Sequence, residues 1–237
     1  MAPARPNPEA SAPTLAALQR LIPACRRCPR LRAYGDAVAR EKRKAYADQI
    51  YWGLPVPGWG DPEARLLLVG LAPGAHGAHR TGRMFTGDRS GDFLYAGLHR
   101  AGLASAPLAR DRDDGLTLLD VYITAAVRCA PPANRPLPEE FAHCRPYLER
   151  ELELLRRLCV IVALGRLAHD QVLAAAQTRT GTLRRADFPF AHAAEFALGP
   201  WRLLDCYHPS QQNTFTGRIT PAMLDALLAR ARARAQG

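Results

Sequence analysis

The sequence predicts a single α/β domain built on a central parallel sheet of four strands, flanked by helices. Of its 237 residues, 48% are hydrophobic, which is enough for one sizeable packed core. Four short apolar runs alternate with longer helical segments, and this alternation favours a parallel sheet covered on both faces. There is no internal repeat, so we expect one domain over residues 14–237. Residues 1–13 are rich in Pro and Ala and predict a disordered tail.

Each expected strand is a short apolar run bounded by polar or turn-forming residues. The first is Arg65–Gly70, which follows a segment that Pro and Gly interrupt from Gly53 to Pro62. The other three strands are expected at Val121–Val127, Cys159–Leu164 and Trp201–Cys206.

The expected helices lie between these strands and at both ends of the chain. Thr14 can cap a short first helix that ends at Leu21. Pro138 and the two glutamates after it open a long helix, because Pro and acidic residues suit a first turn. Thr220 and Pro221 begin the last helix in a similar way. The remaining helices are expected at about Leu31–Asp48, Ser90–Gly102, Pro138–Leu158 and Arg166–Ala176.

Three polar loops rich in Gly and Pro leave strands directly. They are Leu71–Arg89, Arg128–Leu137 and Tyr207–Ile219. In a parallel α/β sheet, the active site lies beyond the carboxyl ends of the strands. We therefore expect the three loops to converge on one cleft.

The chain carries a formal net charge of +10, and Lys42 and Lys44 are its only lysines. A positive field of this size attracts polyanions such as nucleic acid. An arginine-rich proteome would give the same charge with no such partner. The charge run Arg40–Lys44 predicts a solvated helix face, with phosphate contact as an alternative.

Nothing in the sequence predicts a membrane protein. No apolar run approaches the roughly 20 residues that a membrane span needs. The N-terminal segment has no hydrophobic signal region, so we expect a cytoplasmic location. We also expect the protein to be a monomer.

Six cysteines divide into two groups by their surroundings. Cys159 and Cys206 begin or end apolar runs and are expected to be buried strand residues. The other four lie in polar or loop-like segments, and four is the number that one tetrahedral thiolate site needs. Zinc, a [4Fe-4S] cluster and unligated thiols all fit this pattern. These four residues are Cys25, Cys28, Cys129 and Cys144.

Five ordered motifs make the chain resemble the uracil-DNA glycosylase superfamily, specifically its family 5, over nearly its whole length. They are Cys25-x2-Cys28, GLAPGAHG from Gly70 to Gly77, RTGRMFTGD from Arg80 to Asp88, TAAVRCAPPANRP from Thr124 to Pro136, and YHPSQQNTFTGR from Tyr207 to Arg218. The resemblance implies a four-stranded parallel sheet between helices. It also implies a [4Fe-4S] cluster on the four cysteines named above, and it favours iron–sulfur over zinc.

The resemblance also implies how the target base is held after it leaves the duplex. It places Phe85 against the flipped base as a stacking platform. His208 is implied to donate a hydrogen bond to a base carbonyl, where negative charge develops as the base departs. We expect Gly70, Ala72 and Gly74 of the first loop to complete the base-binding site.

The first motif lacks the water-activating group of other branches of the superfamily. Those branches have a carboxylate or amide where this chain has Leu71 and Ala72. The resemblance assigns water binding to Asn134 instead, and a neutral amide orients water but is a poor base. Asp88 is the one carboxylate we add as catalytic, with a helix cap before Ser90 as its equal alternative.

The expected partner is double-stranded DNA that contains uracil or another deaminated base. A non-enzymatic iron–sulfur nucleic-acid-binding module of the same fold is the rival hypothesis, and Ala72 is its best argument. The joint presence of Phe85, Asn134 and His208 argues against that rival. We expect DNA contacts from His76, Ser210, Gln211, Gln212, Asn213, Thr214 and Arg218.

Overall fold

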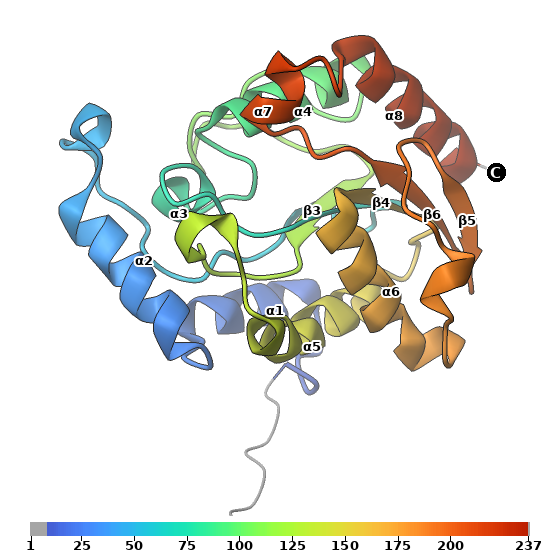
Figure 1. Cartoon of the computed structure of the whole chain (residues 1–237), viewed down its shortest axis with the longest axis horizontal. Coiled ribbons are helices and arrows are strands. Elements are labelled where there is room, and N and C mark those ends of the chain that lie inside the picture. The colour runs from blue at the N-terminus through green and yellow to red at the C-terminus, as the bar shows by residue number, and fades with distance from the viewer. Residues whose placement is uncertain (1–8, 237) are drawn as a thin grey trace, which may run out of the picture.

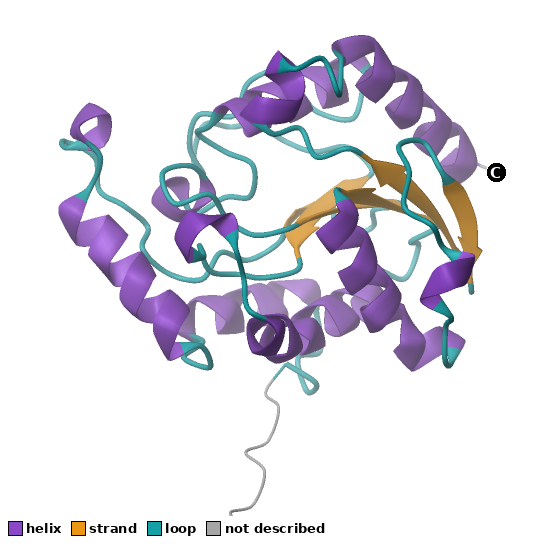
Figure 2. Ribbon diagram, in the orientation of Figure 1, coloured by secondary structure: helices purple, strands orange, loops and turns teal. Residues whose placement is uncertain are grey.

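A computed structural model describes residues 9–236 and arranges them in three layers, with the sheet between two layers of helices (Figure 1). The sheet has six strands in the order β1-β3-β2-β4-β6-β5. Figure 2 shows it as the middle layer. The strands are β1 (Trp59–Gly60), β2 (Leu66–Gly70), β3 (Val121–Ala125), β4 (Val160–Leu164), β5 (Glu195–Leu198) and β6 (Trp201–Cys206).

The four central strands are the predicted ones. β3, β2, β4 and β6 pair in parallel, which confirms the predicted four-stranded parallel sheet. The sequence analysis missed the two edge strands, β1 and β5, which pair antiparallel to β3 and β6. β1 has only two residues and β5 has four residues of mixed exposure, so neither leaves a long apolar run in the sequence.

The helices begin close to the predicted positions. Thr14 caps α1 by accepting a hydrogen bond from the Ala17 N–H (3.1 Å), and Thr220 accepts one from the Met223 N–H (3.3 Å) at the last helix. The α-helices are α1 (Leu15–Leu21), α2 (Pro29–Glu41), α3 (Ala78–Thr81), α4 (Arg89–Arg100), α5 (Pro138–Leu154), α6 (Arg166–Thr180), α7 (Gln211–Phe215) and α8 (Pro221–Gln236). Short 3-10 helices are η1 (Ile22–Ala24), η2 (Lys44–Tyr46), η3 (Pro132–Asn134) and η4 (Arg185–Asp187).

Two hydrophobic cores cover the two faces of the sheet. Alternate residues of β2 point to opposite faces, as in any strand. Leu66 and Leu68 join one core with α4 and α8, whereas Leu67 and Val69 join the other with α5 and α6. All four of these side chains are buried, so the central strand is held from both sides.

Several predicted boundaries, and the predicted burial of one cysteine, differ from the structure. The helix expected to end at Leu158 ends at Leu154, the helix expected to end at Ala176 runs to Thr180, and the strand expected to reach Val127 ends at Ala125. The helix expected to reach Asp48 ends at Glu41, because Lys42 adopts φ +54°, a conformation outside the α-helix. The segment after Lys42 therefore leaves the helix axis and forms η2. Cys159, expected to be buried, is half-buried just before β4.

The predicted tail falls partly outside the described residues, which begin at Glu9. Glu9 itself is buried and pairs with Arg27 (Nη2 to Oε2, 2.5 Å). The Ala12 carbonyl accepts hydrogen bonds from the Arg150 side chain. Residues 9–13 thus contact the domain. Within residues 9–236, no helix has the length and apolar character to cross a bilayer.

Candidate active site

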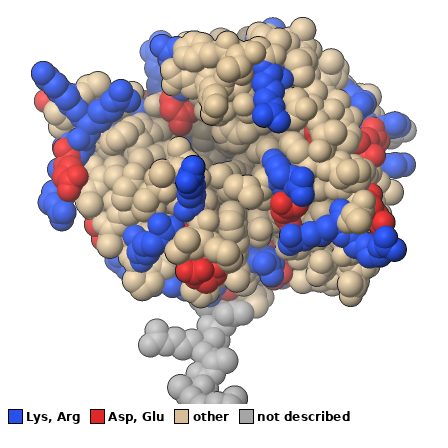
Figure 3. All heavy atoms as spheres, in the orientation of Figure 1, with Lys and Arg blue, Asp and Glu red and all other residues tan. Residues whose placement is uncertain are grey.

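The three predicted loops converge on one cleft at the carboxyl ends of the parallel strands, as expected. We call it the main cleft; its volume is about 480 Å³. It opens on the face that Figure 3 shows hollowed near its centre. Its lining residues are Leu71, Ala72, Pro73, Gly74, Ala78, Met84, Phe85, Asp88, Arg89, Ser90, Ala125, Asn134, His208, Ser210, Gln211 and Gln212.

Phe85 and His208 face each other across part of the main cleft. Their ring centroids are 6.1 Å apart and the planes are tilted by 34°. The Phe85 ring lies over Gly70, where an added Cβ would come within 2.7 Å of the ring. Gly70 therefore does not line the cleft but makes room for Phe85. Phe85 has φ +53°, a strained conformation for a phenylalanine that the surrounding loop must hold in place.

Contacts with its own loop and with Gly165 hold His208 in position. Its carbonyl accepts a hydrogen bond from the Asn213 side-chain amide (2.8 Å), and Gly165 leaves space beside its Cβ. Burial lowers the pKa of His208 to about 4. The imidazole is therefore neutral at pH 7, with one N–H to donate and one nitrogen to accept.

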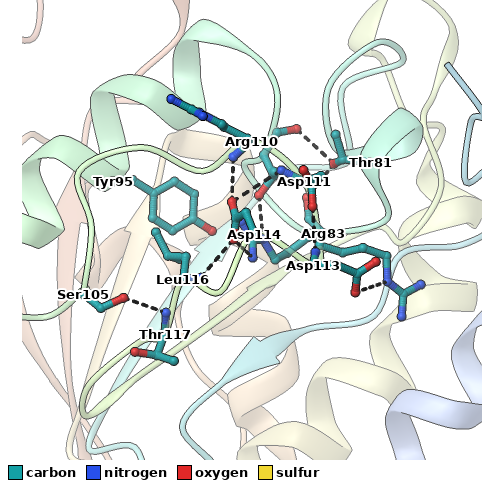
Figure 4. Close-up of polar contacts among 12 residues, drawn as sticks. Thr81, Arg83, Tyr95, Ser105, Arg110, Asp111, Asp113, Asp114, Leu116 and Thr117 are labelled. Carbon is teal, nitrogen blue, oxygen red and sulfur yellow. Dashed lines mark hydrogen bonds and ion pairs between the residues drawn. The ribbon is translucent and has the colours of Figure 1, made fainter. Parts of the chain in front are cut away.

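A buried ion pair anchors the loop that carries Phe85. Arg83 donates two hydrogen bonds to Asp114, at 2.8 and 2.7 Å (Figure 4). Its guanidinium also lies 4.6 Å from the ring centroid of Trp59. Burial raises the pKa of Asp114, but hydrogen bonds from Arg83 and from backbone N–H groups outweigh it and hold the pKa below its usual range. The Tyr95 hydroxyl donates to the carbonyl of Met84 (2.9 Å), immediately before Phe85.

Asp88 caps a helix and also lines the main cleft. Its Oδ1 accepts a hydrogen bond from the Gly91 N–H (3.0 Å) and caps α4, so the cap residue is Asp88. Its other oxygen points at the first loop, where an added Cβ on Gly77 would lie only 2.0 Å away. Burial raises the pKa of Asp88. Among the residues that line the main cleft, Asp88 is the one carboxylate.

Asn134 reaches the main cleft from the second loop. It follows Ala133, and both residues have positive φ values, of +55° and +52° respectively. Asn tolerates this left-handed conformation better than most residues, since its short polar side chain can bond locally. Within residues 9–236 no hydrogen bond of the Asn134 amide group is found, and the side chain is exposed. It is therefore free to bind a water molecule or ligand.

The part of the main cleft that the start of the first loop lines is apolar. Leu71 and Ala72 line the main cleft and pack behind it against a buried cluster that contains Cys28, Cys129 and Cys144. Gly74 also lines the cleft, and an added Cβ there would lie 3.1 Å from Asp88 Oδ2. Leu71 and Ala72 thus give the main cleft an apolar surface. Neither residue supplies the acid or amide that other branches of the superfamily have at these positions.

The residues expected to contact DNA do not all lie in the main cleft. Ser210, Gln211 and Gln212 line the main cleft, and Ser210 also caps α7 by accepting from the Asn213 N–H (3.3 Å). Thr214 donates to the carbonyl of Gln211 within α7. Arg218 is exposed, with its guanidinium 4.7 Å from the Tyr207 ring centroid. His76 lies outside the main cleft and is hydrogen-bonded to the Tyr51 hydroxyl (3.0 Å).

The four expected cluster ligands are free thiols in two adjoining buried clusters. Cys28, Cys129 and Cys144 share one, and Cys25 packs against the next. Burial, followed by repulsion from neighbouring cysteines, raises the pKa of Cys28 to about 12. Within residues 9–236, no three His, Cys, Asp or Glu side chains are grouped as ligands of a single metal ion.

Several cleft residues were not singled out from the sequence. Met84 lies inside the RTGRMFTGD motif, Arg89 directly follows it, and Ala125 ends β3. Their position in or next to the quoted motifs was the only feature of the sequence that could have indicated them. The guanidinium of Arg89 also lies 5.6 Å from the ring centroid of Phe215, an exposed aromatic on α7.

Comparisons with known proteins are consistent with this geometry. Residues 57–232 match the family model described as the uracil DNA glycosylase superfamily. The chain is 56% identical over 205 residues to the type-5 uracil-DNA glycosylase of Mycobacterium leprae, covering 86% of this chain and 88% of the relative. It is 53% identical over 212 residues to that of Thermus thermophilus, covering 89% and 94%. The identity to that of Pyrobaculum aerophilum is 46%, covering 89% of each chain.

Proposed function

Because the chain belongs to the uracil-DNA glycosylase superfamily and is similar over most of its length to type-5 enzymes, we propose that it is a DNA repair glycosylase that excises uracil. The reaction breaks the bond between the base nitrogen and sugar C1′, adds water at C1′ and leaves an abasic site. The observation that carries this proposal is the convergence of Phe85, Asn134 and His208, from three separate loops, on one cleft.

In this mechanism the flipped base stacks on the Phe85 ring, and His208 donates its one N–H to a base carbonyl oxygen. A neutral imidazole suits that role, because it stabilises the departing anion without first losing a proton to it. Stacking and a single donor read few features of the base. We therefore infer that hypoxanthine and modified pyrimidines are accepted as well as uracil, since strong rejection requires buried partners that would be left unpaired.

Asn134 orients the attacking water in this proposal. Asp88, the one carboxylate in the lining of the main cleft, accepts the proton of that water. Burial raises the pKa of Asp88 although the cap hydrogen bonds from Gly91 and Ser90 lower it, and a raised pKa suits a carboxylate that exchanges a proton. Since Leu71 and Ala72 supply no base, water activation is weak. Most of the rate enhancement then comes from holding the base and stabilising its negative charge.

Asn134→Ala is expected to slow the chemical step by about a hundredfold, the typical cost of a misplaced reactant. Affinity for abasic-site DNA should stay nearly unchanged, because the amide holds water and not the sugar. Single-turnover cleavage and fluorescence anisotropy measure the two quantities. Arg135→Ala, an exposed neighbour outside the main cleft, is the matched control. A normal single-turnover rate for Asn134→Ala would show that another group holds the water.

Duplex oligonucleotides with one lesion each test the function itself. Uracil, hypoxanthine and a modified pyrimidine are each placed opposite a matched and a mismatched base, and abasic sites are revealed by alkali. We expect uracil to be cleaved fastest and mispaired lesions to be favoured, because a mispaired base costs less to extract. Binding of the uracil duplex without any cleavage would instead favour the non-enzymatic module.

The four cysteines fit a [4Fe-4S] cluster by their donor chemistry. All are free thiols, three share one buried cluster, and Cys25 and Cys144 are close enough to raise the pKa of Cys28 and Cys129. A four-iron cluster also separates its ligands more widely than a single ion does. We propose that Cys25, Cys28, Cys129 and Cys144 hold it. Its contribution would be structural, joining the segment before α2, the start of the loop after β3, and α5.

The purified protein is expected to be brown and to hold about four irons per chain. Cys25→Ala should lower iron content, solubility and thermal stability together, whereas Cys159→Ala, a thiol outside the set, should keep its iron. Metal analysis of anaerobically purified protein and thermal melting measure these changes. Stoichiometric zinc in the unsubstituted protein would overturn the iron–sulfur proposal.

Duplex DNA is the proposed partner, bound by a cytoplasmic monomer. The net charge of +10 and the exposed polar residues of the third loop support strong, salt-dependent binding that is indifferent to flanking sequence. The segment from Ser210 to Thr214 lies at the rim of the main cleft, where it can enter the space that the flipped nucleotide leaves.

A further inference from the structure

A second cavity, which we call the side pocket, lies beside the main cleft. Its volume is about 300 Å³, and it shares Gly74, Asp88 and Asn134 with the main cleft. The two cavities are therefore neighbours that share part of their wall. The remaining lining comes from the middle of α2, the segment after α2, the first loop and the second loop: Tyr34, Arg43, Tyr46, Ala75, His76, Gly77, Gly87, Pro131 and Ala133.

The far wall of the side pocket is held by Arg80. This buried arginine donates to the carbonyls of His76 (2.7 Å) and Gly87 (2.8 Å) and to the side chain of Gln49. Its guanidinium also lies 4.0 Å from the ring centroid of Tyr46. The segment after α2 is thus tied to the first loop, so that the pocket is formed before any ligand arrives.

The side pocket combines aromatic faces with an unpaired cation. Tyr34 and Tyr46 are half-buried, so part of each ring is accessible. Arg43 is exposed, and within residues 9–236 its guanidinium forms no ion pair. Burial, then the charges of Arg43 and Arg80, lower the pKa of His76. Figure 3 shows Lys and Arg side chains gathered at this end of the molecule, around η2.

Aromatic faces beside a free arginine are the chemistry that binds one nucleotide of a single strand. The rings stack on the base, and the guanidinium pairs with the phosphate. The shared wall sets which nucleotide this is. A strand that places one base in the main cleft reaches the side pocket with the next nucleotide along.

We propose that the side pocket binds the nucleotide adjacent to the excised one in the same strand, with Arg43 on its phosphate and Tyr34 and Tyr46 against its base. This inference rests on the proposed function. It gives the charge run at Arg40–Lys44 a specific role, through one member that faces a cavity. It also makes excision depend on the base and phosphate on one side of the lesion and not on the other.

Substrates altered at single positions next to uracil test the proposal. In one series a neutral methylphosphonate replaces one flanking phosphate, and in the other an abasic analogue replaces one flanking nucleotide, on the 5′ or the 3′ side. For the unsubstituted protein, each change on one side should lower kcat/KM about tenfold. In Arg43→Ala the methylphosphonate on that side should have little further effect. In Tyr34→Ala the abasic analogue on that side should likewise lower kcat/KM little further.

Lys44→Ala is the matched control, because Lys44 is exposed on the same segment and lines neither cavity. Its effect should be additive with every substrate change. Arg43→Lys should restore part of the phosphate dependence, and thermal melting shows whether each variant is folded. If the effects of Arg43→Ala and Tyr34→Ala are additive with every change on both sides, the side pocket does not bind the neighbouring nucleotide. Failure of the proposed function would look different, since the unsubstituted protein would then leave uracil uncleaved.

Discussion

His208→Ala is expected to lower the single-turnover rate of uracil excision by roughly ten- to a thousandfold, as for the loss of one donor that stabilises developing charge. His208 faces Phe85 across the main cleft, and the Asn213 amide holds its carbonyl, so its ring is directed at the bound base. Affinity for abasic-site DNA should change far less, because that ligand has no base carbonyl. Rapid-quench cleavage at saturating enzyme measures the rate.

His208→Gln supplies a neutral donor and should recover part of the rate that His208→Ala loses. His99→Ala is the matched control, since His99 lies on α4 and lines neither cavity. If His208→Ala cleaves within about twofold of the unsubstituted rate, charge stabilisation belongs to another group.

The lowered pKa of His208 predicts a pH dependence with a definite sign. With a folded pKa of about 4, His208 is neutral in the folded protein across pH 5–8, so the cleavage rate should show no step from its titration there. In the unfolded chain the pKa is near 6.5, so that state binds more protons between about pH 6.5 and pH 4. This group therefore makes folding less favourable as pH falls through that window, and His208→Ala should reduce that loss in urea unfolding experiments.

Glu151→Ala is expected to lower the free energy of unfolding by about 3–5 kcal/mol, the cost of leaving a buried charge without its partner. Arg128 and Glu151 are both fully buried, and Arg128 Nη2 lies 2.5 Å from Glu151 Oε2. Thr124 donates to the same carboxylate oxygen (2.8 Å) and accepts from Arg128. The network joins β3, α5 and the start of the loop that carries Asn134.

Urea unfolding followed by circular dichroism measures this loss. The double variant Arg128→Met with Glu151→Leu should lose much less stability than the sum of the two single changes, because it leaves no unpaired charge in the core. Asp225→Ala is the matched control. It breaks the Arg100–Asp225 pair, whose side chains are 45% and 38% exposed, and should cost less than about 1 kcal/mol. A loss for Glu151→Ala no larger than that of Asp225→Ala would show that the buried pair is not needed for stability.

The sequence by itself determined the strands and helices whose pattern lies within a few neighbouring residues. The four parallel strands are continuous apolar runs because both of their faces are buried, and a run of that kind is visible without any partner. Helix starts were visible for a similar reason, since Thr14 caps a helix through residues three positions away. The five motifs led to the family, which the comparisons then confirmed. They also indicated which loops build the cleft.

Only the tertiary structure decided how those loops meet. The edge strands β1 and β5 depend on pairing with β3 and β6, and their own residues carry little pattern. The side pocket forms because Arg80 ties the segment after α2 to the first loop, a contact between residues 31 positions apart. Likewise, Asp88 both caps α4 and lines the cleft only because Gly74 and Gly77 fold over it. Short-range patterns record the period of a helix or strand, whereas these features depend on side chains that folding alone brings together.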